Sequence, residues 1–219
     1  MKSIRIATLT VLLLAAFGAR AESLVINGSL DGGIANANVP LGWTVLEGTP
    51  DTLDVTSNVG IPGWLSFAVA PSFSPDGGTW VGLGGNGDYV ERFGQTLSGL
   101  SVGQTYTVSW QAANFGIQNN AASYLGSNAI GVMLDGSLIG QGATLSLSSN
   151  WSTQSLTFVA TSGSQLLSFR LAGTEKAYLG IDGISVTTGG TPPVPEPSTW
   201  LLMALGGAAL AAVARRRQG

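Results

Sequence analysis

The sequence contains no cysteine and no histidine among its 219 residues. Without cysteine the chain cannot form disulfide bonds, although exported proteins can carry them. Without both residues, the usual zinc sites, haem ligation, thiol chemistry and serine–histidine catalysis are excluded. The fold must therefore be stabilised by a sizeable hydrophobic core, and a metal ion bound through oxygen ligands is the remaining kind of cross-link open to it.

Basic residues are scarce in the middle of the chain. Between residues 22 and 190 there are eleven acidic residues but only three basic ones, which gives this region a net charge of −8. A strongly acidic domain repels nucleic acid phosphates, so we expect no nucleic acid partner. The same charge suits calcium, which is bound by oxygen ligands.

Helical periodicity is absent from residues 24–188, where short apolar runs alternate with turns that use many of the 32 glycines. The clearest run, residues 105–112, has large apolar side chains at even positions and small polar ones at odd positions, which predicts a half-buried strand. Asp135-Gly136 predicts a tight hairpin turn. The predicted strands are residues 23–26, 42–45, 53–55, 65–69, 79–83, 93–97, 105–112, 129–134, 137–139, 155–160, 165–171 and 180–186.

Many short strands at close spacing indicate an all-β fold of the β-sandwich or jelly-roll type. We expect this single domain to span residues 22–188, with a linker rich in Gly, Thr and Pro at residues 189–193. A helix is expected only on each side of the domain, one in the N-terminal segment and one in the C-terminal segment.

Few residues remain that could support catalysis. A glycine pattern at residues 82–87 matches a dinucleotide fingerprint by its letters, but no helix is expected after it, so that function is excluded. Paired carboxylates are the remaining option, and the pairs Asp51/Asp54 and Asp88/Glu91 both lie in loop-like segments. We therefore predict that the chain is not an enzyme, and a polysaccharide hydrolase is the less favoured alternative.

A secretory signal peptide is predicted over residues 1–21. Lys2 and Arg5 supply the positive start, a mostly apolar run follows, and Ala19 and Ala21 form a small-x-small cleavage site. The alternative is an uncleaved membrane span, for which the apolar run is short.

The C-terminal segment, residues 194–219, has three parts in a fixed order. It contains Pro195, Glu196 and Pro197, then an apolar run at residues 200–214, then Arg215, Arg216 and Arg217. The prolines cannot continue a helix or a strand ladder, so this stretch is extended and open to a processing enzyme. The apolar run predicts a hydrophobic helix, and the arginines predict that its end stays on the cytoplasmic side of the membrane.

This segment resembles the PEP-CTERM sorting signal of Gram-negative bacteria. The resemblance implies recognition by an exosortase-type membrane protease, a transient anchor in the inner membrane, and release to the cell surface or the extracellular matrix. The alternative is an ordinary single-span anchor that is never cut.

The middle of the chain is similar to the galactose-binding-like jelly rolls, which include several carbohydrate-binding modules. The similarity rests on segments that recur in the order seen in those domains, namely residues 27–31, 42–43, 78–81, 105–108, 151 and 181–186. The sequence departs from the pattern at Leu30, where an aromatic residue is usual, and at Gly183, where an acidic or amide residue is frequent.

The same resemblance implies a structural calcium ion held by Asp31 and Asp182. In such modules the acidic residue after the first strand and the aspartate of the last strand meet at one edge of the fold. Calcium takes six to eight oxygen ligands, so two carboxylates must be supplemented by backbone carbonyls. The alternative is that Asp31 is a turn residue before two glycines and that Asp182 caps a strand end.

Sugar-binding residues are expected in the long loop after Trp110. Within it, Asn114, Asn119 and Tyr124 are the main candidates, because amides and an exposed aromatic ring recognise hydroxyl groups. Phe115, Gln118 and Asn120 belong to the same loop. Four tryptophans could provide a stacking platform, but we expect most of them to be core residues; they are Trp43, Trp80, Trp110 and Trp151.

Together these patterns predict an exported, non-enzymatic β-sandwich protein of the cell surface, extracellular matrix or biofilm that binds polysaccharide. A purely structural matrix protein without a ligand is the main alternative.

Overall fold

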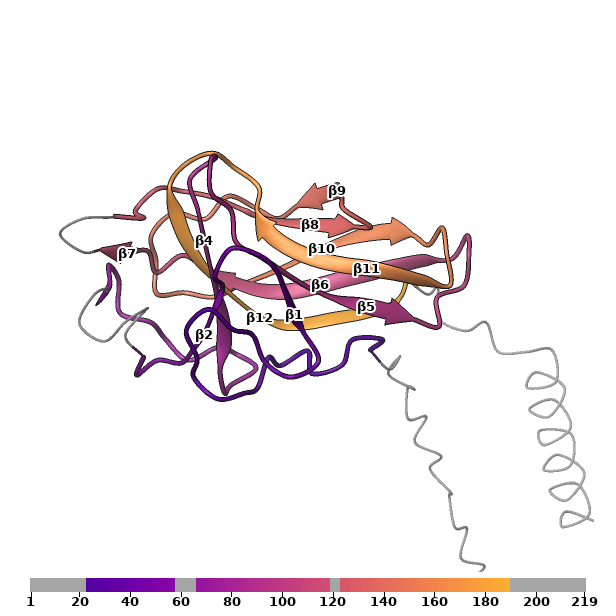
Figure 1. Cartoon of the computed structure of the whole chain (residues 1–219), viewed down its shortest axis with the longest axis horizontal. Helices are drawn as coiled ribbons and strands as arrows, with labels where there is room; N and C mark the ends of the chain where they lie inside the picture. The colour runs from indigo at the N-terminus through magenta and orange to yellow at the C-terminus, as the bar shows by residue number, and fades with distance from the viewer. Residues whose placement is uncertain (1–22, 58–65, 119–122, 190–219) are drawn as a thin grey trace, which may run out of the picture.

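The computed structural model describes residues 23–57, 66–118 and 123–189, and within these ranges the chain forms twelve β-strands and no α-helix. Two five-stranded antiparallel sheets pack face to face, and a two-stranded ribbon lies at one end (Figure 1). The all-β sandwich predicted from the strand pattern is thus confirmed. The signal helix and the C-terminal hydrophobic helix that the sequence predicts lie outside the described residues. In the described part of the chain, no helix has the length and hydropathy that a membrane crossing requires.

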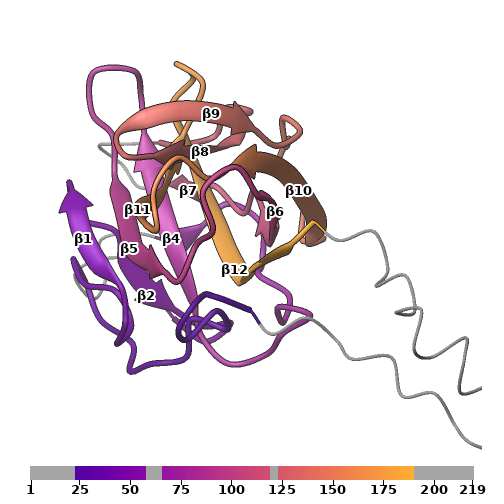
Figure 2. The ribbon, with the colours of Figure 1, turned by 90° about the vertical axis from the view of Figure 1, so that its right-hand side faces the viewer.

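The strands of each sheet are neighbours in space rather than in sequence. The first sheet contains, in order, β1 (Thr44–Glu47), β5 (Arg92–Ser98), β11 (Ser164–Leu171), β8 (Ile130–Leu134) and β9 (Ser137–Gln141). The second sheet contains β10 (Ser152–Val159), β6 (Thr105–Ala113), β12 (Ala177–Thr188), β4 (Trp80–Gly85) and β2 (Asp51–Leu53), and Figure 2 shows β10, β6 and β12 side by side. The ribbon pairs β3 (Ser66–Phe67) with β7 (Ile117–Gln118). The chain passes repeatedly from one sheet to the other, as in jelly rolls.

Strand β6 shows how the sequence pattern builds the core between the sheets. Tyr106, Val108 and Trp110 point inward and are at most 2% exposed, as the alternation predicts. They pack against the first sheet, where the ring of Phe169 lies 6.2 Å from that of Trp110 and 5.8 Å from that of Phe93. Burial of each large side chain contributes roughly 1.5–3 kcal/mol to the free energy of unfolding.

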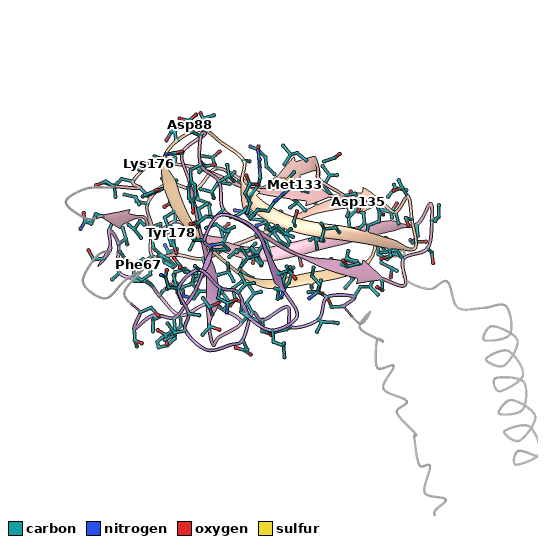
Figure 3. All side chains as sticks on the ribbon, in the orientation of Figure 1. Phe67, Asp88, Met133, Asp135, Lys176 and Tyr178 are labelled. Atoms are coloured by element: carbon teal, nitrogen blue, oxygen red, sulfur yellow. The ribbon has the colours of Figure 1, made fainter. Side chains whose placement is uncertain are left out.

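A second apolar cluster lies on the outer face of the second sheet. Its buried members are Leu53, Trp80, Ala113, Phe115, Ile117 and Tyr178, and we call it the aromatic cluster. The β3–β7 ribbon covers it, and the ring of Phe67 on β3 lies 5.6 Å from that of Trp80. Phe67 and Tyr178 lie toward the end of the sandwich opposite to Asp135 (Figure 3). The second sheet is therefore packed on both faces at this end.

The local strand predictions hold with exceptions. The Asp135-Gly136 hairpin is confirmed, because both residues have the positive φ angles, 49° and 83°, that a type I′ turn requires. The strand predicted at residues 23–26 is wrong. That segment bends into a turn and is attached by separate hydrogen bonds, from the Leu24 N–H to the Val186 carbonyl and from the Ile26 N–H to the Gln95 side chain. The short strand predicted at residues 53–55 lies earlier, as β2.

Candidate functional site

Asp182 on β12 is the most unusual acidic residue on the outer face of the second sheet. Its side chain is fully buried, and among the described residues neither carboxylate oxygen has a hydrogen-bond partner of good geometry. The pKa of Asp182 is raised to about 7, chiefly by burial and to a smaller extent by the charges of Asp76 and Asp31, while the nearby Ser74 hydroxyl and Gly183 N–H oppose the shift. An ionised carboxylate buried in this way needs a compensating positive charge.

The structure brings Asp31 and Asp76 toward Asp182 from two loops. Both are exposed, and the carboxylate of Asp31 lies against Gly78, where no side chain could fit. The β-bulge after Asp182 places Gly183 at a φ of 56°, beside the side chain of Asp76. Among the described residues, no group of three or more carboxylate, histidine or cysteine side chains has the spacing of a complete metal site. A calcium ion here would therefore rely on backbone carbonyls and water for the remaining ligands.

A hollow of about 380 Å³ opens beside this acidic group. Its polar lining includes Ser29, Asp76, Ser109 and Ser185, and the bulge at Gly183 forms part of its wall. The hydroxyls of Ser109 and Ser185 hydrogen-bond to each other at 2.8 Å across strands β6 and β12. Asp76 was not among the candidates from the sequence, because only the fold brings it close to Asp182.

The two carboxylate pairs proposed from sequence proximity are not the pair that the fold forms. Asp54 hydrogen-bonds within its own turn to Thr56 and Ser57, and Asp88 is exposed. Instead, Asp51 and Glu91 lie in one buried network, each only 5% exposed. This network was missed because the two residues are forty positions apart in the sequence.

Each of the two buried carboxyl groups is held by hydrogen bonds from the protein. Glu91 Oε1 accepts from the hydroxyls of Tyr89 and Thr49 at 2.9 and 3.1 Å, and Oε2 accepts from the Gly84 N–H at 2.5 Å. The pKa of Glu91 is raised to about 8, chiefly by burial and to a smaller extent by the charge of Asp51, although these hydrogen bonds oppose the shift.

Asp51 shares this environment and has no cationic partner in it. It accepts hydrogen bonds of 2.9 Å from the hydroxyl of Tyr178 and from the backbone N–H of Ala37, and burial raises its pKa. The only ion pair among the described residues, Arg92 with Glu47, lies elsewhere. At neutral pH the network therefore holds at least one proton, and its groups support the sheet rather than face a ligand.

The loop after Trp110 has a different structure from the exposed binding loop that we expect from the sequence. Asn114 is 1% exposed, and its amide donates to the backbone carbonyls of Gly126 and Leu145, so it holds the loop in place. Phe115 is fully buried in the aromatic cluster. Tyr124 is half-buried, with the ammonium of Lys176 at 4.6 Å from its ring centroid. Asn119 and Asn120 lie outside the described residues.

The tryptophans divide between the two apolar clusters. Trp43 and Trp110 belong to the core between the sheets, and Trp80 belongs to the aromatic cluster, so the core interpretation is confirmed for these three. Trp151 is half-buried at the rim of the aromatic cluster, where its Nε1 donates to the Ser72 carbonyl at 3.1 Å. None of the four therefore offers an open ring face comparable to a stacking platform.

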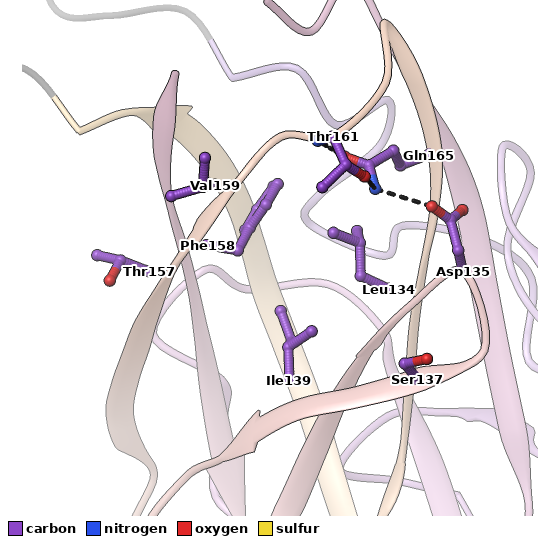
Figure 4. A pocket seen from close by; sticks show the side chains of 9 residues that line it. All are labelled: Leu134, Asp135, Ser137, Ile139, Thr157, Phe158, Val159, Thr161 and Gln165. Atoms are coloured by element: carbon purple, nitrogen blue, oxygen red, sulfur yellow. Dashed lines mark hydrogen bonds between the residues drawn. The ribbon is translucent and has the colours of Figure 1, made fainter. Parts of the chain in front are cut away.

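A groove of about 480 Å³ lies between the edge strands β9 and β10, at the open side of the sandwich (Figure 4). Leu134, Ile139 and Phe158 form its apolar walls. At its polar end, the side-chain amide of Gln165 donates to Asp135 Oδ2 at 2.8 Å and to the hydroxyl of Thr161 at 2.9 Å. Its polar groups are thus largely bonded to one another.

The comparisons with known proteins concern the tail and the fold separately. Residues 193–218 match the PEP-CTERM protein-sorting motif, which contains Pro195, Glu196 and Pro197 and the three terminal arginines predicted from the sequence. These residues lie outside those that the structure describes, as do the predicted signal-cleavage residues Ala19 and Ala21. No curated protein matches the chain.

Solved structures similar to this chain include carbohydrate-binding modules. The xylan-binding domain CBM22-1 of Paenibacillus barcinonensis Xyn10C has 12% identity and a TM-score of 0.48, over 78% of this chain and 97% of that domain. A family 35 carbohydrate-binding module from Clostridium thermocellum has 10% identity and a TM-score of 0.40, over 72% of this chain and 98% of that one.

A third similar structure is the enzymatically active domain of tailspike protein 4 from bacteriophage CBA120, at 13% identity and a TM-score of 0.47. The match covers 76% of this chain but only 21% of the tailspike chain. Such identities are too low to transfer a ligand or an activity. The sorting motif does carry a conclusion: this chain has the PEP-CTERM signal that marks exported proteins, which are membrane-anchored before an exosortase processes them.

Proposed function

We propose that this protein is a non-catalytic component of the cell surface, extracellular matrix or biofilm, and that its β-sandwich binds polysaccharide. The observation that carries the proposal is the PEP-CTERM motif at residues 193–218, on a chain whose described part is a single acidic β-sandwich. The outer surface of the second sheet supports polysaccharide as the ligand, because it offers serine and threonine hydroxyls rather than cationic groups. The alternative is a purely structural matrix protein without a ligand.

Sorting by an exosortase-type protease is the first step of this function. Pro195, Glu196 and Pro197 would be the recognition element, and Arg215, Arg216 and Arg217 would hold the end of the anchor at the cytoplasmic face. Intact-mass analysis of the protein recovered from its host tests the processing. We expect a product that starts at Glu22 and lacks the apolar run at residues 200–214.

Glycan binding is tested with the full-length protein in detergent on an array of neutral and acidic polysaccharides. Retention of one class of polysaccharide, with no release of reducing ends, is the expected result. Absence of retention at millimolar sugar would leave the structural matrix role. Turnover that is lost on Glu91→Gln would instead favour a hydrolase.

A calcium ion at Asp31 and Asp182, with backbone carbonyls and water as its remaining ligands, is part of the proposal. It is supported by the buried, unpartnered carboxylate of Asp182, which a divalent cation would neutralise. The ion would tie the N-terminal loop and the loop before β4 to the last strand.

Removal of calcium should then destabilise the protein. We expect chelator to lower the melting temperature by about 5–10 °C, because an ion that binds only the folded state stabilises it by mass action. The variant Asp182→Asn should lose this response, whereas Asp88→Asn, at an exposed aspartate away from the group, should keep it. A melting curve that chelator leaves unchanged in the wild-type protein would rule out the site.

A further inference from the structure

Three neighbouring strands of the second sheet present rows of hydroxyl groups on its outer face. The pairing of β10 with β6 and of β6 with β12 aligns Thr157, Thr107 and Thr187 in one row, and Ser155, Ser109 and Ser185 in the next. We call these six residues the hydroxyl face. Neighbouring strands, and so the backbones of neighbouring residues within a row, are about 4.8 Å apart, and the two rows are about 6.7 Å apart along the strands.

Burial of the alternate residues in the core makes the hydroxyl face point outward. Tyr106, Val108 and Trp110 alternate with the hydroxyl residues along β6 and are buried between the sheets. A shift of the strand by one residue would bury the hydroxyls and expose the aromatic rings, so the register is strongly determined. The β10 members, Ser155 and Thr157, are exposed, while those on β6 and β12 are partly exposed.

Most of these hydroxyls are available for a ligand. Among the described residues, the only hydrogen bond that joins two members of the face is the one between Ser109 and Ser185. Each hydroxyl can donate one hydrogen bond and accept two. Because the groups stand on a rigid sheet, and threonine has few side-chain rotamers, little conformational entropy is lost when a ligand binds.

The charge of the face selects the kind of ligand. Strands β6 and β10 contain no charged residue, and the only charged residue of β12, Asp182, is fully buried beyond the end of the serine row. The domain around the face has a net charge of −8 between residues 22 and 190. A polyanion would therefore meet no cation and an unfavourable field, whereas a neutral polyhydroxylated chain meets complementary hydrogen-bonding groups.

A hollow extends the face at one edge. The cavity of about 380 Å³ is lined by Ser109 and Ser185 of the serine row and continues toward Ser29 and Asp76. The left-handed backbone at Gly183 forms the bulge that interrupts the β12–β6 pairing beside it. A flat hydroxyl surface that ends in a polar hollow can bind a chain along the rows with one ring in the hollow.

We infer that the hydroxyl face is the polysaccharide-binding surface of this protein and that its ligand is a neutral glycan chain. This inference rests on the proposed function and names the place and the chemical class of its ligand. The face lacks an aromatic residue for stacking, so its affinity comes from several hydrogen bonds of modest strength and is insensitive to salt.

The test compares full-length variants in detergent by affinity electrophoresis and calorimetry, with xylan, laminarin, mannan and hydroxyethylcellulose as neutral probes and alginate as the anionic probe. The double variant Thr107→Val/Thr157→Val removes two hydroxyls without changing side-chain shape. We expect it to bind the preferred neutral glycan about 10-fold more weakly. The matched control, Thr96→Val, makes the same change at an exposed position of β5 in the first sheet and should bind normally.

A second, milder variant separates a loss of binding from a folding defect in the double variant. Ser155→Ala removes one hydroxyl at an exposed position of edge strand β10 and should weaken binding about 2- to 5-fold. If the wild-type protein binds a neutral glycan and neither variant weakens it, the hydroxyl face is not the site, although the proposed function stands. If no glycan binds at all, the proposed function fails as well.

Two further outcomes would also overturn the inference. Preferential binding of alginate that weakens with added salt would contradict a neutral ligand. Sedimentation showing that the wild-type protein self-associates, while Thr107→Val/Thr157→Val does not, would assign the face to contact between copies of the chain.

Discussion

The outer face of the second sheet has two halves that differ completely. At one end it carries the aromatic cluster, in which Trp80 and Phe115 are fully buried under the β3–β7 ribbon. At the other end the same strands β6 and β12 carry the hydroxyl face, which the described part of the chain leaves uncovered. The same two strands build both halves, so the outward-facing side chains decide whether the sheet needs a covering layer.

The boundary between the halves lies where Asp182 pairs with Gln111. On the covered side of this boundary, Gly180 of β12 packs against the rings of Trp80 and Trp151. On the open side, Ser185 of the same strand faces solvent. The proposed calcium site therefore lies where the sheet changes from a covered to an open surface. An ion there would link the loops that cover one half to the strand that supports the other.

The largest expected effect is the loss of the covered half. Trp80→Ala should lower the free energy of unfolding by about 3–5 kcal/mol, because it removes a fully buried ring and leaves a cavity between β4 and the ribbon. Urea denaturation followed by circular dichroism measures the change. Val159→Ala, at an outward position of β10 that is 53% exposed, is the control and should cost far less. A loss below about 1 kcal/mol for Trp80→Ala would contradict a packed aromatic cluster.

The difference between these halves could be predicted only in part from the sequence. The alternation over residues 105–112 identifies Tyr106, Val108 and Trp110 as buried, and the same alternation makes Thr107 and Ser109 face outward. The sequence also predicts that Trp80 and Trp110 are core residues, and the structure confirms this for both. That they belong to different clusters depends on the β3–β7 ribbon, a pairing between residues about fifty positions apart that no local pattern reveals.

The acidic residues show more clearly that local sequence patterns do not predict long-range contacts. Sequence proximity pairs Asp51 with Asp54 and Asp88 with Glu91, whereas the fold buries Asp51 with Glu91 through the pairing of β2 and β4. Asn114 looks like a sugar-binding amide because it follows a strand in a glycine- and asparagine-rich loop. Its actual partners, the carbonyls of Gly126 and Leu145, are set by loop packing. Charge and composition predict which groups are present, but not which of them become buried.

The second expected effect is a pH dependence that arises from the covered half. Glu91 has a pKa of about 8 in the folded protein and an ordinary value of 4.5 in the unfolded chain. As pH rises from 4.5 to 8, the unfolded chain releases this proton while the folded protein retains it. The free energy of unfolding should therefore fall by a few kcal/mol over this range and level off above pH 8.

Glu91→Gln isolates this contribution, since glutamine imitates the protonated carboxyl group and does not titrate. Urea denaturation at a series of pH values, with chelator present throughout, should give a flatter curve for the variant than for the wild-type protein. Asp182, whose pKa is also raised by burial, contributes equally to both curves. Parallel curves for the two proteins would show that Glu91 is ionised in the folded state at neutral pH.

The smallest expected effect belongs to the open half. Thr157→Val should change the free energy of unfolding by no more than about 0.5 kcal/mol, because the residue is exposed and valine fits a strand equally well. Urea denaturation at one pH suffices to measure it. A loss of more than about 1 kcal/mol in the free energy of unfolding would mean that the hydroxyl of Thr157 is needed within the fold. If the cost is small, stability does not explain the presence of a row of threonines at these positions, since valine or isoleucine would serve the sheet as well. The hydroxyls would then be accounted for by what they contact outside the molecule, which is the property that distinguishes this half of the sheet from the covered one.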